Sequence, residues 1–122
     1  MNTFGCFLLV MGHLVGDWIF QTEHQALNKA HGKFFNWPLI GHCLIYTACF
    51  IPIFAWLNFS WWWLILIFSS HMFLDRRWPV VWWIKHIKRT SDNTITNNFW
   101  LVIAVDQVMH LLIITIIVIA EL

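Results

Sequence analysis

The sequence predicts an all-α fold, an integral membrane bundle of four helices, and three observations lead to this prediction. Apolar residues make up 60% of the 122 residues and charged residues 11%, against about 45–50% and about 25% in soluble domains. Four apolar stretches each approach the ~20 residues that a helix needs to cross the hydrocarbon layer of a bilayer. All seven Lys and Arg residues fall outside these stretches or at their ends.

Local signals mark the expected helices. Gly12 and Gly16 form a small-xxx-small step, which predicts that another helix approaches the first one closely. Asn36 is a good N-cap for the second helix, and Pro52 is expected to kink that helix. Residues 58–60 (Asn-Phe-Ser) predict a tight turn. The expected helices cover residues about 4–21, 37–57, 61–77 and 98–120 of a single transmembrane domain, residues 1–122.

A further short helix is expected at residues 79–89. Val80, Ile84 and Ile87 recur at helical spacing, whereas Lys85 and Lys88 occupy other faces. This pattern is typical of an amphipathic helix that lies in the membrane interface. An irregular Trp-rich loop is the alternative.

The positive charges predict the orientation of the bundle. Lys29 and Lys33 lie between the first two expected helices, and the other five Lys and Arg residues lie between the last two or at the end of the third. With four crossings these loops share one side, which the positive-inside rule makes cytoplasmic, with both termini outside. The formal net charge of +1 gives no basic field for a nucleic-acid partner. Membrane lipid is therefore the expected partner.

Ionisable residues inside the apolar stretches are the candidates for function. A lone charged side chain at bilayer depth costs ~2.5 kcal/mol or more, so we expect these residues to compensate one another. Three His/Asp pairs with a four-residue step each place both side chains on one helix face, and the second helix adds one His. At ~1.5 Å of rise per residue, all seven converge in the cytoplasmic half of the bundle. They are His13, Asp17, His42, His71, Asp75, Asp106 and His110.

These seven residues predict a metal site. Imidazole and carboxylate ligands without thiolate suit zinc, iron or manganese, and zinc is the first choice. Seven ligands are enough for two ions that share a carboxylate, or for one ion with oriented ligands. Gln21, Tyr46 and Gln107 are expected to orient the ligands. Asp17 and His42 are also the catalytic candidates, His42 as a ligand or as the general acid and base. Hydrogen-bonded packing histidines and a proton or ion relay remain alternatives.

Four blocks of sequence resemble an uncharacterised family of small bacterial and phage polytopic membrane proteins, catalogued as a domain of unknown function. The blocks are residues 13–22 (HLVGDWIFQT), His42, residues 71–75 (HMFLD) and residues 106–110 (DQVMH). The resemblance covers nearly the whole chain and implies a polytopic fold in the bacterial inner membrane, without an activity. A looser similarity, in residue type and topology alone, is to small membrane proteins labelled metal-dependent hydrolases.

Three functions fit these patterns. The first is a metal-dependent membrane hydrolase for a lipid or lipid-linked substrate, in which the metal lowers the pKa of water towards ~7 and polarises an ester, amide or phosphoester. The second is a relay or transporter for protons or metal ions, which would need a homo-oligomer because four helices are few. The third is a structural or interaction membrane protein, for instance a phage-encoded one, whose polar or metal cluster locks the helices together.

Overall fold

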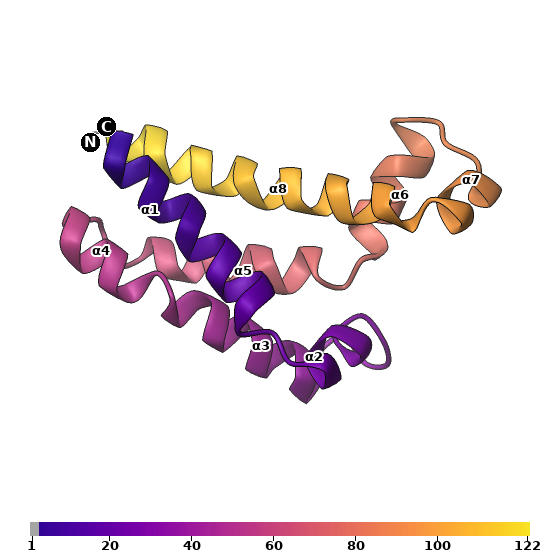
Figure 1. Cartoon of the computed structure of the whole chain (residues 1–122), viewed down its shortest axis with the longest axis horizontal. Coiled ribbons are helices and arrows are strands. Elements are labelled where there is room, and N and C mark those ends of the chain that lie inside the picture. Colours follow the sequence, from indigo (N-terminus) through magenta and orange to yellow (C-terminus); the bar gives the residue numbers. More distant parts are fainter. Residues whose placement is uncertain (1–2) are drawn as a thin grey trace.

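The computed structural model describes residues 3–122, which form helices and no strand, as the sequence predicts. The longer helices pack side by side, and α2, α6 and α7 lie at the end opposite the two chain termini (Figure 1). The elements are α1 (Thr3–Leu14), the π-helical turn η1 (Val15–Ile19), α2 (Glu23–Asn28), α3 (Trp37–Ala48), α4 (Ile51–Leu57), α5 (Trp63–Leu74), α6 (Trp78–His86), α7 (Asp92–Asn97) and α8 (Phe99–Ala120).

The first expected helix changes its form before it ends. After Leu14 the chain continues as η1, in which the N–H of Phe20 donates to the carbonyl of Val15. Such π turns insert a residue into a helix and are frequent at functional sites. The chain then breaks and restarts at Thr22, which forms a capping box with Gln25 and begins α2. A short separate helix therefore follows the first one.

The second expected helix is interrupted by its proline. Asn36 caps α3 as predicted, its side-chain oxygen accepting from the N–H of Leu39. Helix α3 ends at Ala48 and α4 begins at Ile51, because Pro52 has no N–H to donate to the carbonyl four residues before it. At the end of α4, Asn58 adopts a left-handed conformation (φ 55°) and makes the predicted turn.

Within residues 3–122, two helical stretches are long and apolar enough to cross a membrane. One is Trp37–Leu57, which consists of α3 and α4 together, and the other is α8, Phe99–Ala120. Helix α5 is shorter than the expected range 61–77, because Asp75 ends it and Arg77 turns the chain with a positive φ of 66°. Its 12 residues span about 18 Å, less than the ~30 Å of a bilayer's hydrocarbon layer. The structure therefore shows a helical fold with two membrane-length helices.

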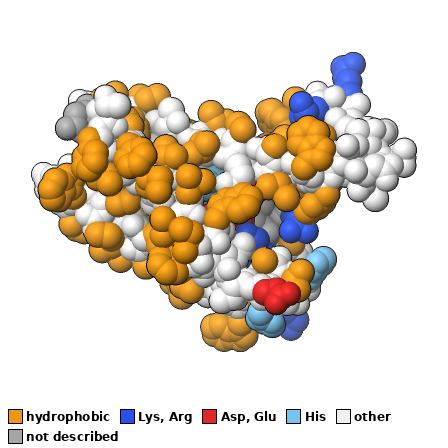
Figure 2. Space-filling model, in the orientation of Figure 1, with side chains coloured by type: hydrophobic (Ala, Val, Ile, Leu, Met, Phe, Trp, Pro, Cys, Tyr) orange, Lys and Arg blue, Asp and Glu red, His pale blue; other side chains and the backbone are white. Residues whose placement is uncertain are grey.

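The segment after α5 contains the short helix that the sequence predicts. Helix α6 buries Val80 and Ile84 completely. These two side chains pack with Leu74, Ile95 and Val102. Apolar side chains cover the end of the molecule that carries the termini, and most of the Lys, Arg, acidic and His side chains in view lie at the other end (Figure 2).

Glu121 ties the end of the chain to the turn between α4 and α5. Its Oε1 accepts hydrogen bonds from the main-chain N–H of Ser60 at 3.1 Å and from Nε1 of Trp63 at 2.6 Å. The bond from the Ser60 main chain, aided by that from Trp63, lowers the pKa of Glu121. This contact fixes the start of α5 relative to the end of α8.

The glycine step of the first helix brings it against α3 and α4, as predicted. A Cβ on Gly16 would lie 3.1 Å from the Cα and 2.9 Å from the Cδ2 of Tyr46, and one on Gly12 would lie 2.6 Å from the Cδ1 of Ile53. All three distances are shorter than ordinary van der Waals contact. The absence of a side chain at Gly16 therefore lets η1 lie directly on the backbone of α3.

Replacing Gly16 by Ala is expected to lower the free energy of unfolding by about 1–3 kcal/mol, because the added methyl group meets a main chain that cannot move aside. Thermal unfolding in detergent, followed by circular dichroism, measures the change. Gly41→Ala is the control, since a Cβ there meets only Nε2 of Gln25, at 3.4 Å. That variant should be neutral or slightly stabilising. Equal effects of the two substitutions would contradict the close approach.

Candidate metal centre

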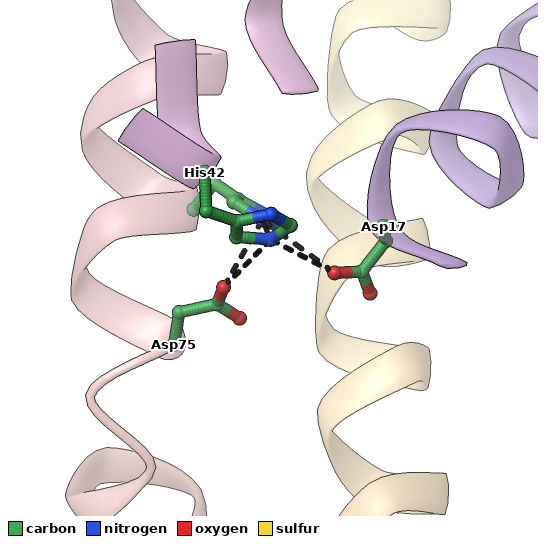
Figure 3. A group of neighbouring side chains, drawn as sticks. Asp17, His42 and Asp75 are labelled. Carbon is green, nitrogen blue, oxygen red and sulfur yellow. Dashed lines mark hydrogen bonds and ion pairs between the residues drawn. The ribbon is translucent and has the colours of Figure 1, made fainter. Parts of the chain in front are cut away.

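Four buried side chains from three segments meet at the end of the bundle that lies away from the termini. Asp17 comes from η1, His42 from α3, His71 from α5, and Asp75 follows the last residue of α5. Each is at most 5% exposed. Figure 3 shows the imidazole of His42 between the carboxylates of Asp17 and Asp75. The sequence spacing predicts that these residues converge, and the structure brings these four together.

The ligand atoms of this group have the spacing of a tetrahedral metal site. Nε2 of His42 lies 3.2 Å from Oδ1 of Asp17 and 3.1 Å from Oδ2 of Asp75. Nε2 of His71 lies 3.2 Å from the same Asp75 oxygen and 3.7 Å from the same Asp17 oxygen. Ligand atoms held at 2.0–2.1 Å around a tetrahedral zinc ion are about 3.3 Å apart. The four atoms could therefore hold one metal ion.

Protons alone do not satisfy these contacts. The two Nε2 atoms of His42 and His71 are 2.9 Å apart, so they cannot both carry a hydrogen. Each of them nevertheless also faces a carboxylate oxygen that accepts only. A cation enclosed by the four atoms would be attracted by every lone pair, whereas a single proton serves one contact. The four atoms could therefore enclose a cation.

Packing, and not a hydrogen bond to the second ring nitrogen, orients these two imidazoles. The Nδ1 atoms of His42 and His71 have no hydrogen-bond partner in the described chain. Tyr46 stacks on His71 instead, with ring centroids 3.6 Å apart and planes 7° from parallel. Tyr46 is one of the residues expected to orient the ligands, and this stacking is how it contacts one of them.

Lys29 supplies a positive charge at the same place, a contact that the sequence analysis missed. Its Nζ lies 2.8 Å from Oδ2 of Asp75 and 3.7 Å from Oδ1 of Asp17. The side chain reaches inward because α2 places Lys29 at its end and because Arg76 donates hydrogen bonds to the carbonyls of the following loop. The capping box at Thr22 would have indicated α2, but the loop contacts carry no local signal.

A second group shares Asp75 with the first. It consists of Asp75, Asp106 and His110, and Nε2 of His110 lies 3.8 Å from Oδ1 of Asp75. Nδ1 of His110 donates to the carbonyl of Asp106 at 2.8 Å. The buried Nε2 then carries the lone pair, and it has no hydrogen-bond partner in the described chain. An imidazole fixed through one nitrogen, with the other free, is the usual form of a metal ligand.

His13 differs from its prediction as a metal ligand. Its Nδ1 lies 2.8 Å from the hydroxyl of Tyr46, and its Nε2 lies 2.9 Å from Oε1 of Gln107. The amide oxygen only accepts, so Nε2 of His13 donates to it and the tyrosine hydroxyl donates to Nδ1. Both ring nitrogens are thus occupied by protein groups. His13 lies outside both groups and forms part of the structure around them.

Gln107 links this chain of hydrogen bonds to the first group. Its Nε2 donates to Oδ2 of Asp17 at 2.7 Å and contacts Oδ2 of Asp106 at 3.3 Å. It therefore reaches a carboxylate in each group, in the orienting role expected of it. Gln21, predicted for the same role, donates only to the main-chain carbonyl of Asp17 at 3.4 Å. Its contact is with the backbone and not with a ligand atom.

A cavity of about 330 Å³ opens beside both groups. Asp17, Asp75 and Asp106 line it, so both groups border this space. His42 does not line it and is fully buried. Of the two predicted catalytic residues, Asp17 thus faces the cavity and His42 does not, which favours His42 as a ligand over a general acid or base.

The fold and the site define the class: an all-helical protein with a buried His/Asp cluster that could hold a metal ion. The chain belongs to the DUF3307 family, described as proteins of unknown function, which matches residues 6–122. This confirms the predicted resemblance at the level of an uncharacterised family. No curated protein and no solved structure matches the chain. All candidate ligands lie within the matched residues, and the match supplies no activity.

Replacing Gln107 by Leu is expected to weaken zinc binding by about 10–100-fold, because the carboxylate of Asp17 loses the amide that orients it. Titration of the purified protein against a zinc-binding chelator measures the affinity. Gln21→Leu is the matched control, since Gln21 contacts only the main chain of Asp17, and a change of less than about threefold is expected. Equal affinity in wild type and Gln107→Leu would show that this hydrogen bond does not orient a ligand.

Proposed function

We propose that the protein is a metal-dependent membrane hydrolase that acts on a lipid or a lipid-linked substrate. The observation that carries the proposal is the set of four ligand atoms, from Asp17, His42, His71 and Asp75, at the mutual spacing of a tetrahedral metal site. Zinc is the first choice because it favours four ligands of this type, with iron or manganese as alternatives. The two buried carboxylates also face the ammonium of Lys29, so a bound dication would share them with that cation.

The two groups differ in the room that they leave for a substrate. The first has four protein ligands, the number found in closed, structural zinc sites, whereas catalytic sites keep one position open. The second has three ligands, and two of them, Asp75 and Asp106, line the cavity. We therefore assign the chemistry to the second group, and Asp75, which belongs to both groups, would help to hold an ion in each.

Each part of the site has a chemical task in this proposal. An ion bound by three ligands lowers the pKa of water towards ~7 and polarises the bond to be cleaved. His110 is held by its bond to the carbonyl of Asp106, so its free nitrogen keeps a fixed direction. Lys29 and Arg77 are the cations that line the cavity, and they are placed to stabilise negative charge that develops on a substrate.

The surface supports a membrane location. In the most apolar 18-residue window of Phe99–Ala120, only 22% of residues are buried inside the protein. A core helix of a soluble protein of this hydropathy would be mostly buried. Large apolar side chains such as Trp56, Ile65 and Ile119 are more than 60% exposed. Lipid is the solvent that such a surface fits, and the charged end (Figure 2) would face the cytoplasm under the positive-inside rule.

The depth of the site supports a lipid substrate. Asp106 is in the second turn of α8, about 10 Å along the helix from Phe99. Scissile bonds of lipids lie near the headgroup, at a comparable depth from the membrane surface. The cavity lies at the charged end of the bundle, where residues 17–29, residues 74–77 and the first turns of α8 contribute to its lining.

A proton or ion relay fits the structure less well. Beyond His110, α8 has only Thr115 as a polar residue, and its hydroxyl donates to the carbonyl of Leu111. The helices around that half pack as an apolar cluster that includes Phe50 and Phe54. In the described chain no polar path is seen from the site to the end that carries the termini. The third function, a structural or interaction membrane protein whose cluster locks the helices together, has one observation in its favour. This observation is the closed four-ligand group.

Elemental analysis of the purified protein tests the metal site, and two equivalents of zinc, iron or manganese are expected. Asp106→Asn should retain about one equivalent, because the first group does not include Asp106, whereas His71→Ala should lose the ion of the first group. His24→Ala, a change on exposed α2, is the control and should retain both. A folded wild-type protein without bound metal, even after reconstitution, would refute the hydrolase proposal.

Hydrolysis of lipid esters, amides and phosphoesters by the protein in vesicles tests the activity. Asp106→Asn is expected to lower the rate by at least 100-fold while the first ion stays bound, because only the open group is lost. His24→Ala should keep the wild-type rate. A metal-loaded protein whose Asp106→Asn variant keeps the biological phenotype would instead support the structural function.

A further inference from the structure

We propose that Arg77 binds the phosphate group of an anionic amphiphile in the cavity, and that the hydrocarbon chain of this ligand lies in an adjoining apolar groove. The inference rests on the proposed function and names its class of substrate, a phosphate ester with a long apolar chain. Three observations support it: the guanidinium of Arg77 without a carboxylate partner in the described chain, the strained turn that carries it, and an apolar groove whose lining includes the next residue, Trp78.

Arg77 is a cation at the site whose charge has no carboxylate partner within residues 3–122. Lys29 pairs with Asp75 at 2.8 Å, and Arg76 donates to main-chain carbonyls. The guanidinium of Arg77 instead lies over the ring of Phe99, 4.9 Å from its centroid, and both residues line the cavity. A guanidinium stacked on an aromatic ring keeps its N–H groups free to donate two hydrogen bonds to one phosphate, in a bidentate contact.

The backbone at Arg77 is strained. Its φ of 66° and ψ of −32°, with the N–H of Trp78 donating to the carbonyl of Arg76 at 2.8 Å, form a γ-turn with positive φ. This is the rare form of the turn, and positive φ is costly for a residue with a side chain. A glycine would adopt the turn without that cost. The strain falls on a residue whose side chain lines the cavity.

An apolar groove of about 610 Å³ lies between α5, α6 and α8. Its lining includes Trp78, the residue after Arg77, and it shares Leu74 with the cavity. Trp82 and Trp83 form one wall, and Met109 and Ile113 form part of the other. Arg77 therefore stands where a polar cavity meets an apolar groove, the arrangement that a charged headgroup and its chain require.

A phosphate ester fits this arrangement better than a fatty carboxylate does. Both anions can bind a guanidinium, but only the ester has a bond that the proposed two-ion site could cleave. Pairs of metal ions that share a ligand commonly stabilise the attacking and leaving oxygens of a phosphoester. The apolar groove excludes a free phosphate as the complete ligand, because such an ion would leave it unfilled.

Quenching of tryptophan fluorescence by brominated lipids tests the inference, since Trp78, Trp82 and Trp83 line the groove. The protein is reconstituted in phosphatidylcholine vesicles that contain a small fraction of brominated lipid. The probe is a non-hydrolysable phosphonate analogue of phosphatidic acid, and brominated diacylglycerol is the neutral comparison. We expect the wild type to prefer the phosphonate by roughly tenfold, the effect of hydrogen bonds to a charged group.

Arg77→Gln should lose this preference, to less than about twofold. Arg89→Gln is the matched control, because it removes the same charge from another residue with positive φ (54°) that does not line the cavity. It should keep the preference. An equal loss of the phosphonate preference in both variants would show that surface charge alone causes it, and this would overturn the inference. A wild type without any preference for the phosphonate would overturn it as well. If inorganic phosphate displaced the phosphonate completely and abolished its quenching, the role of the groove would be overturned.

Metal analysis of the same samples separates this inference from the proposed function. Arg77→Gln is expected to keep the wild-type metal content, which shows that the site is intact while lipid recognition is lost. Metal-free wild-type protein that still shows the Arg77-dependent preference would refute the hydrolase and leave the lipid site standing. Metal-loaded protein with no Arg77-dependent preference would refute the lipid site alone.

Discussion

The burial of two carboxylates against two imidazoles is the constraint on which the rest of this structure depends. Asp17 and Asp75 are almost fully buried together with His42 and His71, and the four residues come from three helical segments. Breaking a buried charge pair by removing one partner costs about 3–5 kcal/mol. The segments are therefore held at one relative position at this end, while an apolar cluster that includes Phe50 and Phe54 packs the other end. The residues that hold the segments together are thus also the candidate metal ligands.

Much of this arrangement could be predicted because it follows from helical periodicity. A four-residue step places His71 and Asp75 on one face in any α-helix. In the structure Nε2 of His71 lies 3.2 Å from Oδ2 of Asp75. The same rule fails for His13, because the π turn that begins at Val15 lies between it and Asp17 and adds a residue to the helical turn. Local sequence gives no sign of that insertion. His13 consequently bonds to Tyr46 and Gln107 and not to a ligand group.

The contacts that could not be predicted depend on tertiary packing. Lys29 looks like one more basic loop residue, and its place beside Asp75 depends on the loop that Arg76 holds from another part of the chain. The sequence also predicts the end of α5 too late, at residue 77 instead of Leu74. The end of α5 is set by Asp75 and by the γ-turn at Arg77, and both belong to the site. A helix that stops at its ligand brings that ligand to the cavity.

The shared carboxylate of Asp75 explains why a closed group and an open group occur side by side. One of its oxygens faces His42, His71 and Lys29, and the other faces His110. The four-ligand group fixes the direction of this carboxylate, since its first oxygen is held by several partners. The second oxygen is then preorganised toward His110 and Asp106, where the cavity gives access. The first group holds the carboxylate of Asp75, whereas the second group lies against the cavity, and under the proposed function the reacting bond would lie next to α8 and Arg77.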